Sequence, residues 1–318
     1  MAINLLFVVV GAAILLGGGE VLVRGAVALA RSLGVSTMII GLTVVAYGTS
    51  APELAVSVMA AASGKPAICS GNVVGSNIIN VLLVLGATAA IFPLQATAAF
   101  LRREVPIMVG VSVLFLVMAW NGVLSRAEAA ILLVALASYT LLAIQIARRE
   151  KKEVVRKYEE HQTAISKRSV AFNLVLIVVG LTMLTGGSHV FLDGAVGVAR
   201  WLGVSDAIIG LTLVALGTSL PELAAGLIAA YRKHGDICLG NIVGSCIYNL
   251  AAIAGLSGVV APLPFESEMI HVHIPVMVGS AVVLWLMLLS GSRLSRLEGL
   301  LLLGLYLGYV GWMVAGHV

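Results

Sequence analysis

Long apolar runs with very few charged residues are the feature that most constrains how this chain can fold. Each run is about 20 residues long, the length that an α-helix needs to cross the hydrocarbon core of a bilayer. Their cores lie at residues 3–23, 37–60, 71–91, 105–121, 125–147, 170–192, 206–230, 240–260, 271–289 and 297–315. The runs are too long for the alternating pattern of a membrane β-barrel. The sequence therefore predicts an all-α integral membrane protein with ten transmembrane helices.

Composition excludes a water-soluble protein. Only 11% of the 318 residues are charged, 60% are hydrophobic and the mean hydropathy is +1.08, whereas about 25% of the residues in a soluble domain are charged. The net charge of +4 is too small and too scattered to indicate a nucleic-acid partner. The three cysteines suggest no disulfide framework. The partner that this composition predicts is the lipid bilayer.

The basic residues predict the orientation of the spans. If the N-terminus lies outside, only Lys65, Arg126 and Arg200 of the 19 Lys and Arg residues fall outside, and the other sixteen are cytoplasmic. This asymmetry follows the positive-inside rule. No basic residue precedes Arg24, so we interpret the first run as a span rather than a secretory signal. We expect a multi-pass protein of the inner (plasma) membrane with both termini outside.

An internal repeat relates two parts of the chain. The segment GLTVVAYGTSAPELAVSVMAA from Gly41 aligns with GLTLVALGTSLPELAAGLIAA from Gly210. The segment GNVVGSNIIN from Gly71 aligns with GNIVGSCIYN from Gly240 at the same offset of 169 residues. The matched blocks are long and carry the same polar residues, so we interpret them as a duplication.

The duplication predicts three parts of the chain. Residues 1–147 form a first five-helix repeat, 148–169 a charged cytoplasmic linker, and 170–318 a second five-helix repeat. Because five is an odd number, the second repeat enters the membrane from the side opposite the first. Inverted repeats with a site at their interface are typical of secondary transporters.

Glu53 and Glu222 are the two acidic residues that lie deep inside predicted spans, and they occupy the same position of the repeat. A carboxylate at the centre of a bilayer costs at least about 2.5–3.5 kcal/mol on insertion scales. A bound cation would compensate this cost. The pair therefore indicates a cation site between the two repeats.

The residues before each glutamate favour coordination by oxygen. Pro52 and Pro221 have no backbone N–H, so the carbonyls of Gly48 and Gly217 lose their helical donors and the helices should bend there. Hydroxyl and amide side chains on the same spans add oxygen atoms, namely Thr49, Ser50, Thr218, Ser219, Asn72, Ser76, Asn80, Asn241, Ser245 and Asn249. Ligand sets made of oxygen alone suit Ca²⁺ or Na⁺ and not a zinc or copper site. We expect no cofactor.

The doubled motifs resemble the two α-repeats of the cation/calcium exchanger superfamily, most closely the prokaryotic sodium/calcium antiporters. The resemblance implies exchange of Ca²⁺ for Na⁺ by alternating access, with the first and sixth spans sliding against a core of the second, third, seventh and eighth. It also implies a ligand set that consists of the carboxylates of Glu53 and Glu222, carbonyls near Ala46, Thr49, Ala215 and Thr218, hydroxyls of Ser50, Ser76, Ser219 and Ser245, and the polar pair Asn80 and Asn249.

One departure from the family affects the charge of the site. Some members carry an acidic residue at one of the positions of Asn80 and Asn249. With asparagine at both, the predicted core holds two negative charges rather than three.

Other functions remain as alternatives. A proton-coupled Ca²⁺ antiporter would use the same fold, because a buried glutamate also carries H⁺, and a passive cation channel is a further possibility. An enzyme is not expected, since no nucleophile–base pair lies within the spans. We expect Glu20 to pair with Arg24 or to take part in cation access, and His271 and His273 to be interfacial. The sequence leaves the oligomeric state open.

Overall fold

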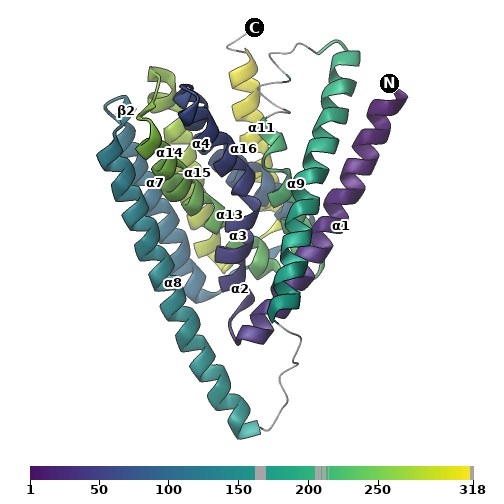
Figure 1. Ribbon diagram of the computed structural model, residues 1–318, viewed down its shortest axis with the longest axis vertical. Coiled ribbons are helices and arrows are strands. Elements are labelled where there is room, and N and C mark those ends of the chain that lie inside the picture. Colours follow the sequence, from purple (N-terminus) through teal and green to yellow (C-terminus); the bar gives the residue numbers. More distant parts are fainter. Residues whose placement is uncertain (162–169, 205–208, 210–212, 214, 316–318) are drawn as a thin grey trace.

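A computed structural model describes residues 1–161, 170–204, 209, 213 and 215–315, and most of these are helical (Figure 1). The first half contains α1 (Ala2–Leu33), α2 (Thr37–Ile40), α3 (Ala46–Thr49), α4 (Ala51–Ala62), α5 (Pro66–Ile78), α6 (Gly86–Ile91), α7 (Val105–Ala119) and α8 (Arg126–His161). The second half contains α9 (Val170–Trp201), α11 (Ala215–Gly217), α12 (Leu220–Tyr231), α13 (Gly235–Tyr248), α14 (Ala254–Val260), α15 (Ile274–Gly291) and α16 (Arg296–Ala315).

Short π-helical stretches and strands connect these helices. The π-helical stretches are η1 (Gly41–Val45), η2 (Ile79–Leu85), η3 (Phe100–Glu104), η5 (Asn249–Ile253) and η6 (Met269–His273). The strands are β1 (Leu94–Gln95), β2 (Val123–Leu124), β3 (Leu263–Pro264) and β4 (Arg293–Leu294).

Within the described residues, seven helices are long and apolar enough to cross a membrane. They are Ala2–Leu33, Pro66–Ile91, Arg126–Arg149, Val170–Trp201, Gly235–Val260, Met269–Gly291 and Arg296–Ala315. The bent pair Thr37–Thr49 and Ala51–Ala62 would be an eighth span. The prediction of an α-helical membrane protein is therefore confirmed.

Two predicted spans lack a counterpart among these candidates. The span at 105–121 corresponds to a helix that begins earlier, at Phe100, and includes Arg102, Arg103 and Glu104. For the span at 206–230, residues 205–208, 210–212 and 214 lie outside the described residues, which leaves the shorter apolar helix α12.

The predicted linker is partly helical. Helix α8 continues through its charged C-terminal part to His161, and residues 162–169 lie outside the described part of the chain. Residues 148–161 contain no Gly or Pro and are rich in Arg, Lys and Glu, which favour helix. The helix therefore has no sequence signal that would end it at the predicted boundary of residue 147.

The strands pair across the two halves of the chain. Strand β1 pairs with β4, so that Leu94 lies opposite Leu294, and β2 pairs with β3, so that Val123 lies opposite Pro264. In the repeat, β1 corresponds to β3 and β2 corresponds to β4. The first strand of each half therefore pairs with the second strand of the other half. A two-fold relation between the halves produces this pattern, because it exchanges the pair β1–β4 with the pair β3–β2.

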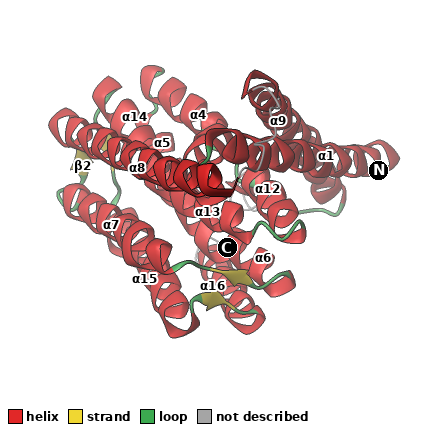
Figure 2. Cartoon of the chain, turned by 90° about the horizontal axis from the view of Figure 1, so that it is seen from below, coloured by secondary structure: helices red, strands yellow, loops and turns green. Residues whose placement is uncertain are grey.

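Helices α1 and α9 pack along each other at one side of the bundle (Figures 1 and 2). Glycines bring their backbones close together: a Cβ added at Gly11 would lie 2.4 Å from the backbone nitrogen of Phe191, and one added at Gly180 would lie 2.6 Å from that of Leu22. Small residues permit such close approach between membrane helices. The interior of the bundle is formed by α5–α6 and by α13–α14, and the residues of α13–α14 are almost all buried. Few residues of α16 are buried.

This close packing can be tested with two alanine substitutions on α9. The Gly180→Ala variant is expected to lose about 1–3 kcal/mol of stability, because its new methyl group overlaps the α1 backbone. The matched control is Gly186→Ala, since a Cβ at Gly186 meets no atom within 4 Å. The control should be as stable as the original protein or slightly more stable, because alanine favours helix. Thermal unfolding in detergent measures both, and equal melting temperatures would contradict the tight α1–α9 contact.

Candidate cation site

Two helices are interrupted where the repeated motif contains proline. Helix α3 ends at Thr49 and α4 begins at Ala51 after Ser50, and the segment Thr37–Thr49 is bent by 44° from α4. The second half has a matching break, because α11 ends at Gly217 and α12 begins at Leu220. The predicted bend is thus confirmed for the first motif, and its cause is a proline that cannot donate a hydrogen bond to the preceding turn.

Glu53 and Glu222 lie in the first turn of the helices that follow these breaks. Their exposed fractions are 1% and 0%. The N-terminal dipole of a helix stabilises a nearby carboxylate by about 0.3–1 kcal/mol and at most about 2 kcal/mol. That is less than the cost of at least about 2.5–3.5 kcal/mol for placing each carboxylate in a membrane. The two carboxylates therefore need a further source of positive charge.

Side chains from the two halves meet at this place. The Ser50 hydroxyl donates a hydrogen bond to Oε1 of Glu222 over 3.2 Å, and the Thr49 hydroxyl donates to Oδ1 of Asn241 over 3.1 Å. The Ser245 hydroxyl lies 3.4 Å from the carbonyl oxygen of Ala46. The contacts join α3 and Ser50 to α12 and α13, so the site is shared between the repeats.

Many oxygen atoms of the predicted ligand residues have no partner within the described part of the protein. They are Oε2 of Glu53, Oε2 of Glu222, Oγ1 of Thr218, Oγ of Ser219, Oδ1 of Asn80 and Oδ1 of Asn249. A buried polar group without a partner costs about 1–3 kcal/mol. Other buried polar atoms without a partner occur on residues outside the predicted ligand set, namely Thr88, Asn173, Asn241, Ser257 and Trp285. Six oxygen atoms without a partner belong to the predicted ligand residues, which indicates that a bound ligand satisfies them.

The two asparagines at the predicted ligand positions lie in π-helical stretches. Asn80 belongs to η2, which packs against α12, and Asn249 begins η5, which packs against α4. Each asparagine therefore comes from an element that packs against the helix of one of the two glutamates. A π-turn interrupts the regular ladder of helical hydrogen bonds and is frequent at functional sites. The sequence pattern predicted these residues as ligands but gave no signal for the π-helical backbone.

The remaining predicted ligand residues lie on elements that pack against one another, since α5 contacts both α11 and α13. Ser76 and Ser245 are buried on α5 and α13, and Ala215 begins α11. Asn72, by contrast, braces two helices: its amide donates to Oγ of Ser57 over 2.8 Å and to the carbonyl of Glu53 over 3.3 Å. Its part in the structure is to hold α4 against α5.

A third buried acid was not predicted. Glu104 on η3 is 4% exposed, accepts a hydrogen bond from Nε of Arg103 over 2.6 Å and another from the Tyr139 hydroxyl over 3.1 Å. The equivalent pair in the second half is His273 with Tyr309, whose hydroxyl lies 2.8 Å from Nδ1. Only the tyrosine recurs in the repeat, because the position of Glu104 is occupied by His273, so the alignment gave no signal for a buried acid. Glu104 has its own cationic partner and is separate from the Glu53–Glu222 site.

Other candidates have partners outside the site. Glu20 pairs with Arg24, as predicted, and also with Arg232. His271 lies 2.8 Å from the carbonyl of Ser267. The described residues contain no group of three or more His, Cys, Asp or Glu side chains that would hold a metal ion. The ligands available at the site are therefore two carboxylates with hydroxyl, amide and carbonyl oxygens, a set that suits Ca²⁺ and Na⁺.

Comparisons with known proteins agree with this chemistry. The profile of the sodium/calcium exchanger protein family matches residues 3–145 and 172–315. The putative antiporter CaxA of Alkalimonas amylolytica is 37% identical, over 97% of this chain and 98% of its own. The sodium/calcium exchanger MaX1 of Methanosarcina acetivorans is 33% identical, over 98% of each chain.

The fold also matches a solved structure. A structure of the sodium-calcium exchanger NCX_Mj, soaked with zero Na⁺ and Ca²⁺, superposes with a TM-score of 0.82 and 33% identity, over 98% of this chain and 99% of that chain. The sequence match extends over both halves, and the structural match covers nearly the whole chain. This integral membrane protein therefore belongs to the sodium/calcium exchanger family.

Proposed function

We propose that this protein is a secondary active transporter that exchanges Ca²⁺ for Na⁺ across the inner membrane by alternating access. The observation that carries the proposal is the pair of buried carboxylates, Glu53 and Glu222, each with an unpartnered oxygen. The two motifs meet, because Ser50 of the first motif donates a hydrogen bond to Glu222 of the second. One Ca²⁺ balances the charge of the two carboxylates, and so do two monovalent cations, so the ions compete for one site.

The surrounding oxygen atoms would complete the coordination of the ions. Ca²⁺ takes six to eight oxygen ligands, which is more than two carboxylates provide. The proposed further ligands are the hydroxyls of Thr49, Ser50, Ser76, Thr218, Ser219 and Ser245, the amides of Asn80 and Asn249, and the carbonyls of Ala46 and Ala215. The unpartnered oxygens among them support this assignment.

The proposed architecture is ten helices in two inverted five-helix repeats, with 148–169 as the cytoplasmic linker and both termini outside. The exchanged pairing of β1 with β4 and of β2 with β3 supports the repeat. The end of α1 that carries the N-terminus and the C-terminal end of α16 both lie at the top of Figure 1, and the C-terminal end of α8 lies at the bottom. This arrangement supports placing the termini and the linker on opposite sides.

The charge of the empty site would couple the two ion fluxes. Without a cation the site carries two negative charges, and moving these through the low-dielectric core is costly. The protein would therefore change its open side when Ca²⁺ or Na⁺ is bound and resist that change when empty. We propose that α1 and α9 slide as a pair against the core, which their close mutual packing supports.

The coupling ion can be tested by ⁴⁵Ca²⁺ flux into proteoliposomes. Uptake is expected when an outward Na⁺ gradient is imposed. It is expected to be absent without a counter-ion gradient, because the empty site would not change its open side to bind the next Ca²⁺. Uptake driven by a pH gradient alone would instead favour the proton-coupled antiporter. Uptake that needs no gradient and shows no stimulation by ions on the opposite side would indicate a channel and would contradict the proposal.

A further inference from the structure

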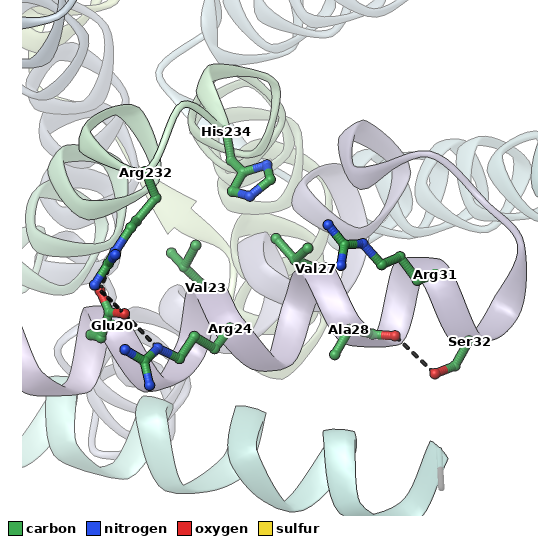
Figure 3. Close-up of a pocket in the computed structure, with 9 residues that line it drawn as sticks. All are labelled: Glu20, Val23, Arg24, Val27, Ala28, Arg31, Ser32, Arg232 and His234. Atoms are coloured by element: carbon green, nitrogen blue, oxygen red, sulfur yellow. Dashed lines mark hydrogen bonds and ion pairs between the residues drawn. The ribbon is translucent and has the colours of Figure 1, made fainter. Parts of the chain in front are cut away.

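A pocket of about 360 Å³ lies between α1 and the turn that joins α12 to α13 (Figure 3). The side chains of Val23 and Val27 on α1 form part of its apolar wall. Arg31 extends along α1 beside Val27, and His234 faces it from the α12–α13 turn. The pocket is separate from the Glu53–Glu222 site, which lies in the buried interior.

The pocket carries an excess of positive charge. Three arginines and one glutamate line it. Glu20 is occupied, because it accepts a hydrogen bond from Arg24 Nε over 2.5 Å and two from Arg232, over 2.7 and 2.8 Å. Within the described part of the chain, the guanidinium of Arg31 and the imidazole of His234 make no hydrogen bond or ion pair. Two donor groups thus face the pocket without an anion.

The duplicated fold does not require two of these charges. The repeat places Asp193 at the position of Arg24 and Ser63 at the position of Arg232, whereas Arg31 and His234 correspond to the basic residues Arg200 and Lys65. The corresponding helices form in both halves with these different residues. Arg24 and Arg232, and with them the ion pairs of Glu20, therefore distinguish this end of the molecule, which the distribution of Lys and Arg assigns to the cytoplasm.

We propose that this pocket binds the phosphate group of an anionic ligand, either a phospholipid headgroup or a free phosphate. A guanidinium offers paired N–H donors that match the oxygens of a phosphate, and His234 adds a third donor. Basic pockets between membrane helices on the cytoplasmic side bind acidic headgroups, and the apolar wall of Val23 and Val27 suits the start of an acyl chain. Glu20 holds Arg24 and Arg232 at the rim without cancelling the charge of Arg31.

The position of the pocket gives a bound phosphate a structural consequence. Arg31 belongs to α1, whereas His234 belongs to the turn before α13. An anion held by both would bridge these two elements in addition to the ion pair of Glu20 with Arg232.

Binding can be measured on the full-length protein in detergent, independently of transport. The probes are dioctanoyl phosphatidylglycerol, dioctanoyl phosphatidylcholine and inorganic phosphate, followed by native mass spectrometry and thermal shift. The anionic lipid is expected to bind more tightly than the zwitterionic one. The Arg31→Gln variant should bind it about ten-fold more weakly, the loss of roughly one charge-assisted hydrogen bond. His234→Gln provides a second variant in case the first does not fold.

The matched control is Lys65→Gln. Lys65 is the repeat counterpart of His234, is exposed and does not line the pocket. Lys65→Gln therefore lowers the net charge by the same amount as Arg31→Gln but leaves the pocket unchanged. Its affinity should equal that of the unmodified protein. Displacement of the lipid by inorganic phosphate would identify a general phosphate site, and lipid binding that resists phosphate would identify a headgroup site. The proposal would be overturned if Arg31→Gln and His234→Gln both bound the anionic lipid as tightly as the unmodified protein does. Equal binding of the anionic and the zwitterionic lipid, or binding of no probe, would also overturn it.

Discussion

Replacing Glu53 or Glu222 by glutamine is expected to reduce Ca²⁺ exchange by about 150-fold to 5000-fold. Glutamine keeps the size of the side chain and one oxygen but removes a negative charge that a bound cation would neutralise. Removal of one partner from a buried charge pair costs about 3–5 kcal/mol, which corresponds to this range of affinity. The measurement is the initial rate of ⁴⁵Ca²⁺ uptake into proteoliposomes under a Na⁺ gradient, over a range of Ca²⁺ concentrations.

A control and a second readout separate loss of the site from loss of the fold. Glu266 is an exposed carboxylate near β3, and Glu266→Gln should transport Ca²⁺ at the original rate. Both site variants should fold, because glutamine keeps the size of the side chain and removes a charge that is costly to bury. Ca²⁺ at about 100 times its dissociation constant should stabilise the original protein by about 2.7 kcal/mol in thermal unfolding, and the variants far less. Normal exchange by both variants would show that the site lies elsewhere.

The sequence predicted these two residues because the duplication repeats them. A single glutamate in an apolar run has several explanations, but Glu53 and Glu222 occupy one repeat position, each after a proline, in a chain with few charges. The bend at Ser50 followed from the missing N–H of Pro52, a local rule that needs no tertiary information. Motif, burial cost and backbone chemistry all indicated the same position.

The same reasoning could not predict which side chains contact each other. Asn72 and Asn80 lie on one helical stripe at a spacing of eight, yet Asn72 bonds to Ser57 and the carbonyl of Glu53, whereas Asn80 Oδ1 has no partner in the described residues. The difference depends on which neighbouring helix each one meets. Glu104 was missed for a related reason, since its burial depends on Tyr139, which is distant in the sequence.

The length of helices at the membrane surface was also difficult to predict. Helix α1 extends to Leu33, well beyond the apolar core that ends at residue 23, and α8 extends to His161. Hydropathy identifies the part of a helix that lies in hydrocarbon, but a helix continues in water wherever its residues favour that conformation. In both cases the charged continuation has no glycine or proline before the observed end, apart from Gly25 in α1.

Substituting aspartate for Asn80 or Asn249 is expected to make Ca²⁺ exchange depend on the membrane potential. With two carboxylates, one Ca²⁺ and two monovalent cations balance the same charge, so exchange by the original protein should be electroneutral. A third carboxylate, placed where an amide oxygen now has no partner, would require one more monovalent cation per cycle. One net charge crossing 100 mV is worth about 2.3 kcal/mol, so the Ca²⁺ accumulation ratio should change by about 50-fold.

Proteoliposomes with the potential clamped by valinomycin and K⁺ gradients test this expectation. Asn121→Asp is the matched control, because Asn121 is exposed and its Oδ1 accepts a hydrogen bond from the Val123 amide, which an aspartate also accepts. The control adds the same charge outside the membrane interior and should remain insensitive to potential. If Ca²⁺ accumulation by the original protein already depends on the potential as steeply as accumulation by Asn80→Asp and Asn249→Asp, the original exchange is not electroneutral. The two glutamates alone would then not determine the charge carried per cycle, because adding a third carboxylate would leave that charge unchanged.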